Sequence, residues 1–71
     1  MNIPQQDIAL TPREQDVLNL IAKGLSDAEI AENLVLTVGT VKWYNRQIYS
    51  KLGVASRTEA VTLALRIQIV R

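Results

Sequence analysis

Three copies of one helix-start pattern constrain the fold of this chain more than any other feature of its sequence. In each copy a serine or threonine stands three residues before a glutamate, at Thr11–Glu14, Ser26–Glu29 and Ser56–Glu59. The hydroxyl and the glutamate side chain can then satisfy backbone N–H groups of the first helical turn reciprocally. We therefore expect a helix to begin directly after the hydroxyl residue in each copy.

Further start and stop signals predict a fourth helix and the bounds of all four. Pro12 suits the first helical position because an N–H there has no helical partner. Gly24 and Gly53 can take the positive φ that commonly ends a helix, and Thr37 can cap one more helix. The expected helices run from Pro12 to just before Gly24, from about Asp27 to Leu34, from roughly Val38 to Leu52, and from after Ser56 to about Gln68.

The second and third of these helices are expected to form a helix-turn-helix inside an all-α, four-helix domain over residues 11–71. Val35 and Leu36 make a turn so short that the following helix must cross the preceding one. Residues 1–10 include Pro4 and show little periodicity, so they are expected to form an N-terminal arm or a linker.

The third helix has two well-separated faces. We place Val41 at 0° on a helical wheel with about 100° per residue. The residues within about 40° of it are Asn45, Ile48 and Leu52. The opposite face and its flanks carry Gly39, Lys42, Trp43, Arg46, Gln47 and Ser50. A short helix, a tight turn and a longer helix with a basic and aromatic outer face are typical of proteins that enter the DNA major groove.

Lys42, Trp43 and Arg46 are the predicted base-contacting residues. Arginine can bond O6 and N7 of guanine together, and lysine can reach guanine or a phosphate. An exposed tryptophan between two cations usually marks a binding surface. The alternative is that Trp43 folds back onto the N-terminal arm.

The start of the third helix supplies candidate phosphate contacts at Thr37 and Thr40, because a helix N-terminus attracts anions. Thr37 alternatively serves only as the cap. Gly39 costs ~1 kcal/mol relative to alanine inside a helix. It either lets the backbone approach DNA closely or is merely tolerated near a helix end.

Charge is distributed unevenly along the chain. Residues 1–32 hold six acidic and two basic residues, a net charge of −4, whereas residues 33–71 hold six basic residues and one acidic residue, a net charge of +5. A basic half attracts phosphate even though the whole chain carries only +1. Acidic residues also suit helix N-termini, but that account does not explain where the bases lie.

Composition argues against several classes of protein. The chain has no cysteine and no histidine, so neither a disulfide nor a metal site is expected. It also lacks a glycine-rich phosphate loop, so neither an enzyme nor a cofactor is expected. No run approaches the ~20 apolar residues of a membrane span, and a cytoplasmic protein without a membrane partner is expected.

Two long stretches of the chain carry a resemblance to a known family. They are LTPREQDVLNLIAKGLSDAEIAENL and TVKWYNRQIYSKLGVASRTEAV. Together they resemble the LuxR-type (GerE-like) helix-turn-helix family of bacterial transcriptional regulators, a similarity that extends from Leu10 to Val70. The resemblance implies a DNA-binding domain over residues 11–71 that acts as a dimer.

The resemblance also implies roles for individual residues. Base contacts are implied at Lys42, Trp43 and Arg46, the residues that the helical wheel also selects. Tyr44 stands where the family usually has histidine. The implied phosphate contacts are at Thr40, Lys51 and Arg57.

The fourth helix carries apolar residues on more sides than one core contact can bury. Ala60, Ala64 and Ile67 are expected to face the core, while Val61 and Leu65 pack on the partner in a homodimer. The alternative is deeper burial of this helix under the N-terminal arm. A two-fold dimer would present two recognition helices to half-sites about one DNA turn apart, ~34 Å.

The sequence therefore predicts sequence-specific binding of double-stranded DNA and regulation of transcription, with RNA polymerase as a further expected contact. The rivals are a protein-interaction module and a domain of a polymerase specificity factor. Binding through several phosphates weakens steeply as salt rises, whereas hydrophobic docking does not. Most members of the family attach this module to an upstream receiver, ligand-binding or ATPase domain, and a few consist of the module alone.

Overall fold

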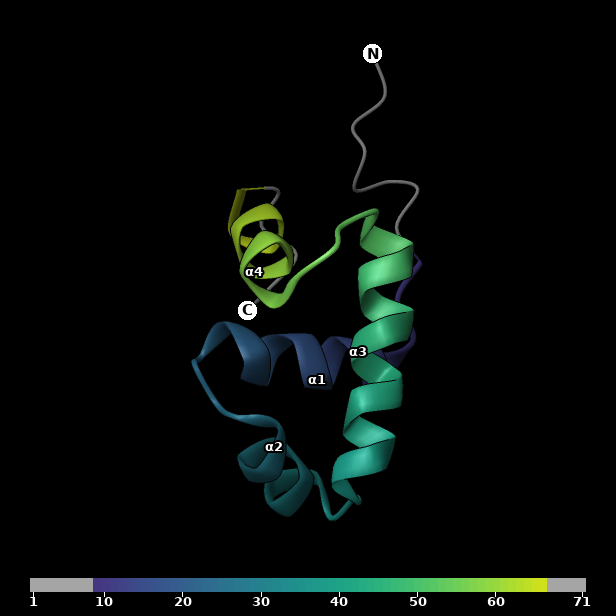
Figure 1. Ribbon diagram of the computed structural model, residues 1–71, viewed down its shortest axis with the longest axis vertical. Coiled ribbons are helices and arrows are strands. Elements are labelled where there is room, and N and C mark those ends of the chain that lie inside the picture. Colours follow the sequence, from purple (N-terminus) through teal and green to yellow (C-terminus); the bar gives the residue numbers. More distant parts are fainter. Residues whose placement is uncertain (1–8, 67–71) are drawn as a thin grey trace.

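The computed structural model describes residues 9–66, which form four α-helices and no β-strand. Their bounds are α1 Pro12–Ala22, α2 Asp27–Leu34, α3 Val38–Leu52 and α4 Arg57–Arg66. In Figure 1, α3 runs along one side of the molecule, α1 lies across its middle, and α2 and α4 lie toward opposite ends. The predicted all-α, four-helix class is confirmed. The expected end of the fourth helix at Gln68 lies outside the described residues, as does most of the expected N-terminal arm.

Two of the three predicted capping boxes are complete. The Thr11 hydroxyl accepts a hydrogen bond from the Glu14 N–H at 3.1 Å, and the Glu14 carboxylate accepts one from the Thr11 N–H at 2.8 Å. Ser26 and Glu29 exchange the same pair of bonds at 3.2 and 2.8 Å. These bonds fix the first residues of α1 and α2 where the sequence placed them.

The third box is only half formed. The Ser56 hydroxyl accepts from the Glu59 N–H at 3.2 Å, as expected for an N-cap. The Glu59 carboxylate, however, accepts from the N–H of Ala55 at 2.9 Å rather than from that of Ser56. The Glu59 side chain therefore binds the backbone of Ala55, the residue before the cap, and α4 still begins at Arg57.

The ends of α1, α2 and α3 all depend on residues with positive φ. Gly24 has φ of 92° and Gly53 has φ of 70°, in agreement with their predicted roles. Val35 closes α2 with φ of 58°, which is an unfavourable backbone for a β-branched residue. The N–H of Leu36 then bonds to the Ala31 carbonyl at 2.8 Å. This strained residue makes the tight turn that leads into α3.

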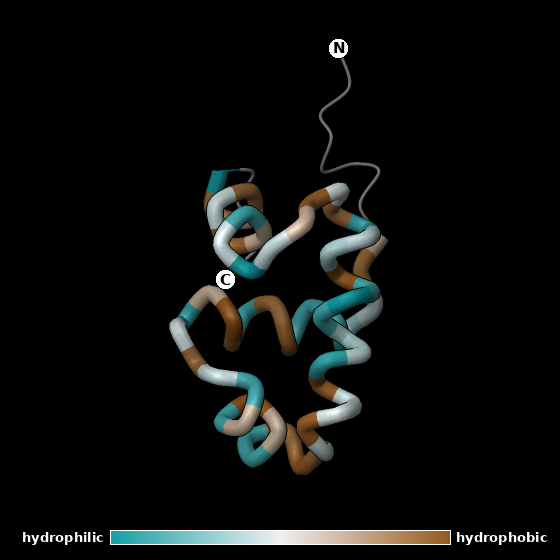
Figure 2. Tube along the Cα trace, viewed as in Figure 1, coloured by the Kyte–Doolittle hydropathy of each residue, from teal (hydrophilic) through white to brown (hydrophobic). Residues whose placement is uncertain are grey.

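The core is apolar and lies between α1, α3 and the two helices that pack against both of them. Both α1 and α3 pack against all three other helices, and Figure 2 shows the hydrophobic residues of α1 in the middle of the molecule. The buried apolar residues are Val17, Leu18, Ile21, Ile30, Ala31, Val41, Ile48, Leu52, Ala60 and Ala64. The predicted inner seam of α3 and the inward positions of Ala60 and Ala64 are confirmed, while Ile67 lies outside the described residues.

Replacing Ile48 by alanine tests this seam. Ile48 is fully buried, so Ile48→Ala should lower the free energy of unfolding by ~2–5 kcal/mol. Chemical denaturation of the 71-residue chain measures the change. Ser50→Ala, an exposed position on the same helix, is the matched control and should stay within about 0.5 kcal/mol of wild type. An unchanged denaturation midpoint for Ile48→Ala would contradict the assignment of the two faces.

Candidate nucleic-acid interface

The outer face of α3 consists of Gly39, Lys42, Trp43, Arg46 and Ser50. All five residues are exposed, in contrast to the buried seam on the other side of the helix. The other three helices therefore do not cover these five positions of α3, which runs along one side of the molecule (Figure 1). The structure therefore places the three predicted base-contacting residues together on an accessible surface.

The two cations on this face have no ionic partner within residues 9–66. The ion pairs of this range involve Arg13, Lys51 and Arg57, and none involves Lys42 or Arg46. The two side chains are four residues apart and thus neighbours on one side of the helix. Their charges remain available to an anionic ligand.

Trp43 lies between these cations and is 48% exposed. Its ring meets that of Tyr44 edge-to-face, with the centroids 5.1 Å apart and an angle of 74° between the planes. Tyr44 in turn packs partly against the core. The tryptophan thus contacts Tyr44 within α3 and keeps a large apolar surface in solvent between the two cations, as is typical of a binding surface.

The hydroxyl groups of Thr37 and Thr40 are bonded to each other at the start of α3. Thr37 Oγ1 accepts from the Thr40 N–H at 3.1 Å and donates to Thr40 Oγ1 at 2.9 Å. Thr37 therefore acts as the cap, which is one of its two expected roles. The Thr40 hydroxyl accepts this bond, so its own hydrogen can be donated to another group.

Gly39 occupies the first turn of α3 although the fold does not require a glycine there. Its φ is not positive, in contrast to those of Gly24 and Gly53. A Cβ added to it would meet only the Thr37 hydroxyl, at an ordinary contact distance of 3.9 Å. Neither backbone conformation nor internal packing explains the choice of glycine.

Lys51, an expected phosphate contact, is tied to α1. Its ammonium group lies 2.7 Å from the Glu14 carboxylate and donates to the Ala9 carbonyl at 3.2 Å. Glu14 is only 4% exposed, so this ion pair compensates a nearly buried charge. Only a capping role could be predicted for Glu14, because a partner 37 residues away leaves no local signal in the sequence.

Arg57, the other expected cationic phosphate contact, is likewise bonded within the protein. Its guanidinium donates to the Leu25 carbonyl and lies 3.6 Å from the Asp27 carboxylate. The same Asp27 oxygen accepts a hydrogen bond from the Asn45 amide at 2.9 Å. We call Leu25, Asp27, Asn45 and Arg57 the polar junction, which joins the start of α2, the middle of α3 and the start of α4.

The expected dimer residues differ in exposure. Leu65 is 58% exposed, whereas Val61 is partly buried and packs against the core of its own chain. Thr58 and Thr62 are exposed at the helical spacing that puts them on the side of Leu65. The solvent-facing side of α4 is therefore centred on Leu65, with Val61 at its edge.

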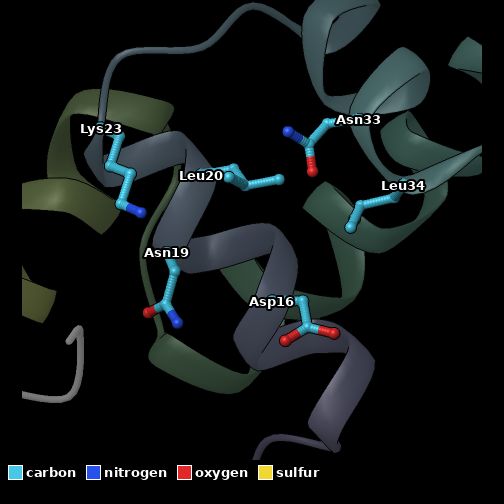
Figure 3. A pocket seen from close by; sticks show the side chains of 6 residues that line it. All are labelled: Asp16, Asn19, Leu20, Lys23, Asn33 and Leu34. Atoms are coloured by element: carbon cyan, nitrogen blue, oxygen red, sulfur yellow. The ribbon is translucent and has the colours of Figure 1, made fainter.

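A shallow depression of about 310 Å³ lies between α1 and α2, apart from α3 (Figure 3). Its lining residues are Asp16, Asn19, Leu20, Lys23, Asn33 and Leu34. None of them belongs to the outer face of α3, so this depression is separate from the candidate interface. Among the described residues there is no group of three metal-binding side chains and no helix long and apolar enough to cross a membrane.

Comparison with known proteins agrees with this geometry. The family model GerE, bacterial regulatory proteins of the luxR family, matches residues 8–64. The transcriptional regulatory protein YdfI of Bacillus subtilis is 46% identical over 66 residues, which are 93% of this chain and 31% of YdfI. The chain thus spans less than a third of this relative.

Two solved structures share the fold. The response regulator ChrA of a haem-sensing two-component system superposes with a TM-score of 0.83 at 40% identity, covering 87% of this chain and 31% of ChrA. One chain of the dimeric LuxR-type receptor VqmA from Vibrio cholerae superposes with a TM-score of 0.87 at 31% identity, covering 92% of this chain and 29% of that chain.

The ion pair between Glu14 and Lys51 predicts how stability depends on pH. Burial alone raises the pKa of the Glu14 carboxyl, but the bonds from Lys51 and from the Thr11 N–H and the Lys51 charge outweigh it. The pKa therefore lies below its usual value of 4.5. A lowered pKa in the folded state gives stability that is present above this usual value and is lost as the pH falls toward the folded pKa.

Glu14→Gln should therefore reduce the loss of melting temperature between about pH 6 and pH 3. Glutamine keeps an oxygen that can accept from the Thr11 N–H but removes the charge. The matched control is Glu29→Gln, which changes an exposed capping box. Equal acid sensitivity of Glu14→Gln and wild type would show that the pair with Lys51 does not stabilise the fold.

Proposed function

Because the chain belongs to the luxR family of bacterial regulatory proteins, we propose that it binds double-stranded DNA by placing α3 in the major groove and thereby regulates transcription. The observation that carries this proposal is the outer face of α3. This face presents Lys42, Trp43 and Arg46 to solvent, and neither cation is paired within the described residues. Such a surface matches the charge of DNA and the width of its major groove.

Four residues of the face have proposed roles. Arg46 bonds O6 and N7 of one guanine, and Lys42 contacts a guanine or the adjacent phosphate. Trp43 supplies apolar contact between them and excludes water from the interface. Gly39, which the fold does not require, leaves room for the first turn of α3 to approach the DNA backbone.

Thr40, Lys51 and Arg57 are proposed to contact phosphates at the rim, with Thr37 beside them at the helix N-terminus. Thr40 has a hydroxyl hydrogen to donate, and the helix N-terminus adds a favourable dipole. Lys51 and Arg57 keep 37% and 36% of their side chains exposed while bonded within the protein. They can approach a phosphate from these positions only if their internal bonds are shared with it.

Arg46→Ala tests the proposed readout. It should weaken binding to a duplex selected from a random pool by ~1–3 kcal/mol and relax the preference at one base pair. Fluorescence anisotropy with the selected duplex and a scrambled one measures both effects. Lys23→Ala is the matched control, because it removes an equal charge from an exposed site at the end of α1. If Arg46→Ala bound both duplexes as wild type does, α3 would not be the recognition helix.

The salt dependence of the same measurement separates DNA binding from a protein-docking role. Several phosphate contacts should make the logarithm of the affinity fall steeply and linearly with the logarithm of the salt concentration. An apolar docking surface centred on Trp43 would be nearly insensitive to salt. Binding that does not weaken with salt would favour the docking role.

We further propose a two-fold homodimer through α4, with Leu65 at its centre and Val61 at its edge. Leu65 is a large apolar residue left 58% exposed, and a two-fold contact would bury both copies against each other. The two α3 helices would then face half-sites about one DNA turn apart, ~34 Å. A module this small gains much of its association energy from binding both half-sites together.

Leu65→Glu should prevent this dimer by placing two like charges at the contact. Sedimentation with an inverted-repeat duplex should give two chains per duplex for wild type and one for the variant. Ala28→Glu, an exposed substitution in the first turn of α2, adds the same charge elsewhere and should leave the ratio at two. Binding of a single wild-type chain to the inverted repeat would rule the dimer out.

A further inference from the structure

Asn45 is a buried polar residue on the otherwise apolar seam of α3. It is 7% exposed, while its seam neighbours Val41, Ile48 and Leu52 are apolar and buried. An amide transferred from water to such a site is unfavourable unless it is hydrogen-bonded. Stability alone would therefore favour an apolar side chain at this position.

The hydrogen bonding of Asn45 is directional and incomplete. Its Nδ2 donates to Asp27 Oδ1 at 2.9 Å, and Arg57 Nη1 lies 3.6 Å from the same oxygen. Its Oδ1 is buried and has no hydrogen-bond partner among the described residues. The residue thus retains an unsatisfied acceptor in order to make one bond to the first residue of α2.

That bond constrains α3 in a way that apolar contacts do not. The apolar contacts of Val41 and Ile48 resist rotation of α3 through close packing, which has no preferred direction. A hydrogen bond in addition requires its donor to point at its acceptor, and it weakens steeply once the angle becomes poor. Asp27 is itself held, because it belongs to the first turn of α2 and pairs with Arg57 at the first turn of α4. The polar junction therefore fixes one angular position of α3 against two other helices.

We propose that Asn45 is a positioning residue that sets the rotation of α3 about its axis and so aims Lys42 and Arg46 at the base edges. Arg46 follows Asn45 directly in the helix, and a rotation of roughly 20° moves a point on the helix surface by about 2 Å. Such a shift exceeds the tolerance of a bidentate bond to guanine. This proposal rests on the proposed role of α3 in DNA recognition.

Asn45→Leu tests the proposal, because leucine is similar in size and cannot bond to Asp27. The variant should melt at or above the wild-type temperature, since the unsatisfied acceptor is removed. Its preference for the selected duplex over the scrambled one should nevertheless fall by about tenfold, or ~1.4 kcal/mol. Ile48→Val is the matched control on the same seam: it should lower the melting temperature and leave the preference unchanged.

Exchanging the side chains of Asn45 and Asp27 provides an independent test of the hydrogen bond between them. Asn45→Asp alone places two carboxylates together and should lower the preference. Adding Asp27→Asn restores one donor and one acceptor in reverse order but removes the ion pair with Arg57, so it should recover part of the preference that Asn45→Asp loses. If Asn45→Leu does not fold, the comparison of single and double variants decides the proposal.

Nuclear Overhauser effects between protons of α3 and α2 in the DNA-free protein measure the contacts between the two helices. These contacts report the rotation of α3 about its axis without any assumption about DNA. They should change in Asn45→Leu, and they should be closer to the wild-type pattern in the double variant than in Asn45→Asp. Wild-type contacts and wild-type preference in a folded Asn45→Leu would overturn the proposal, as would a double variant no better than Asn45→Asp. If the wild-type protein itself prefers no duplex, the proposed function fails, and these contacts alone decide whether Asn45 positions α3.

Discussion

The burial of one side of α3 is the constraint on which the rest of the structure depends. Val41, Ile48 and Leu52 lie along the side of α3 that packs against α1, α2 and α4. Because a helix turns by about 100° per residue, burying these positions forces Lys42, Trp43 and Arg46 outward. The same contacts that hold this small domain together therefore create its exposed basic and aromatic surface.

Hydrogen bonds and ion pairs further fix the orientation of α3 within this apolar packing. Lys51 joins α3 to the buried Glu14 of α1, and the polar junction joins α3 to the starts of α2 and α4. Val35 enters an unfavourable backbone conformation to make the short turn before α3. Strain at such a position persists only when surrounding structure over-determines it. Here the helix that follows the turn packs against three other helices.

Local features of the fold could be predicted from the sequence, and distant pairings could not. The starts of α1 and α2, the glycine ends and the two faces of α3 follow from bonds and spacings within a few residues. The partner of Lys51 lies 37 residues away, and that of Asn45 lies 18 residues away. The helical wheel placed Asn45 inside but could not identify Asp27 as its acceptor, because that contact depends on how α2 crosses α3. The base-contacting and phosphate-contacting residues remain predictions.

Methylation interference on the selected duplex tests the central claim, that α3 reads the major groove, most directly. Methylation of guanine N7 blocks the major-groove edge, whereas methylation of adenine N3 blocks the minor groove. We predict that N7 methylation of guanines within each half-site prevents binding, and that one of these guanines loses its effect with Arg46→Ala. Interference from adenine N3 alone, with guanine N7 methylation tolerated throughout the site, would contradict the account.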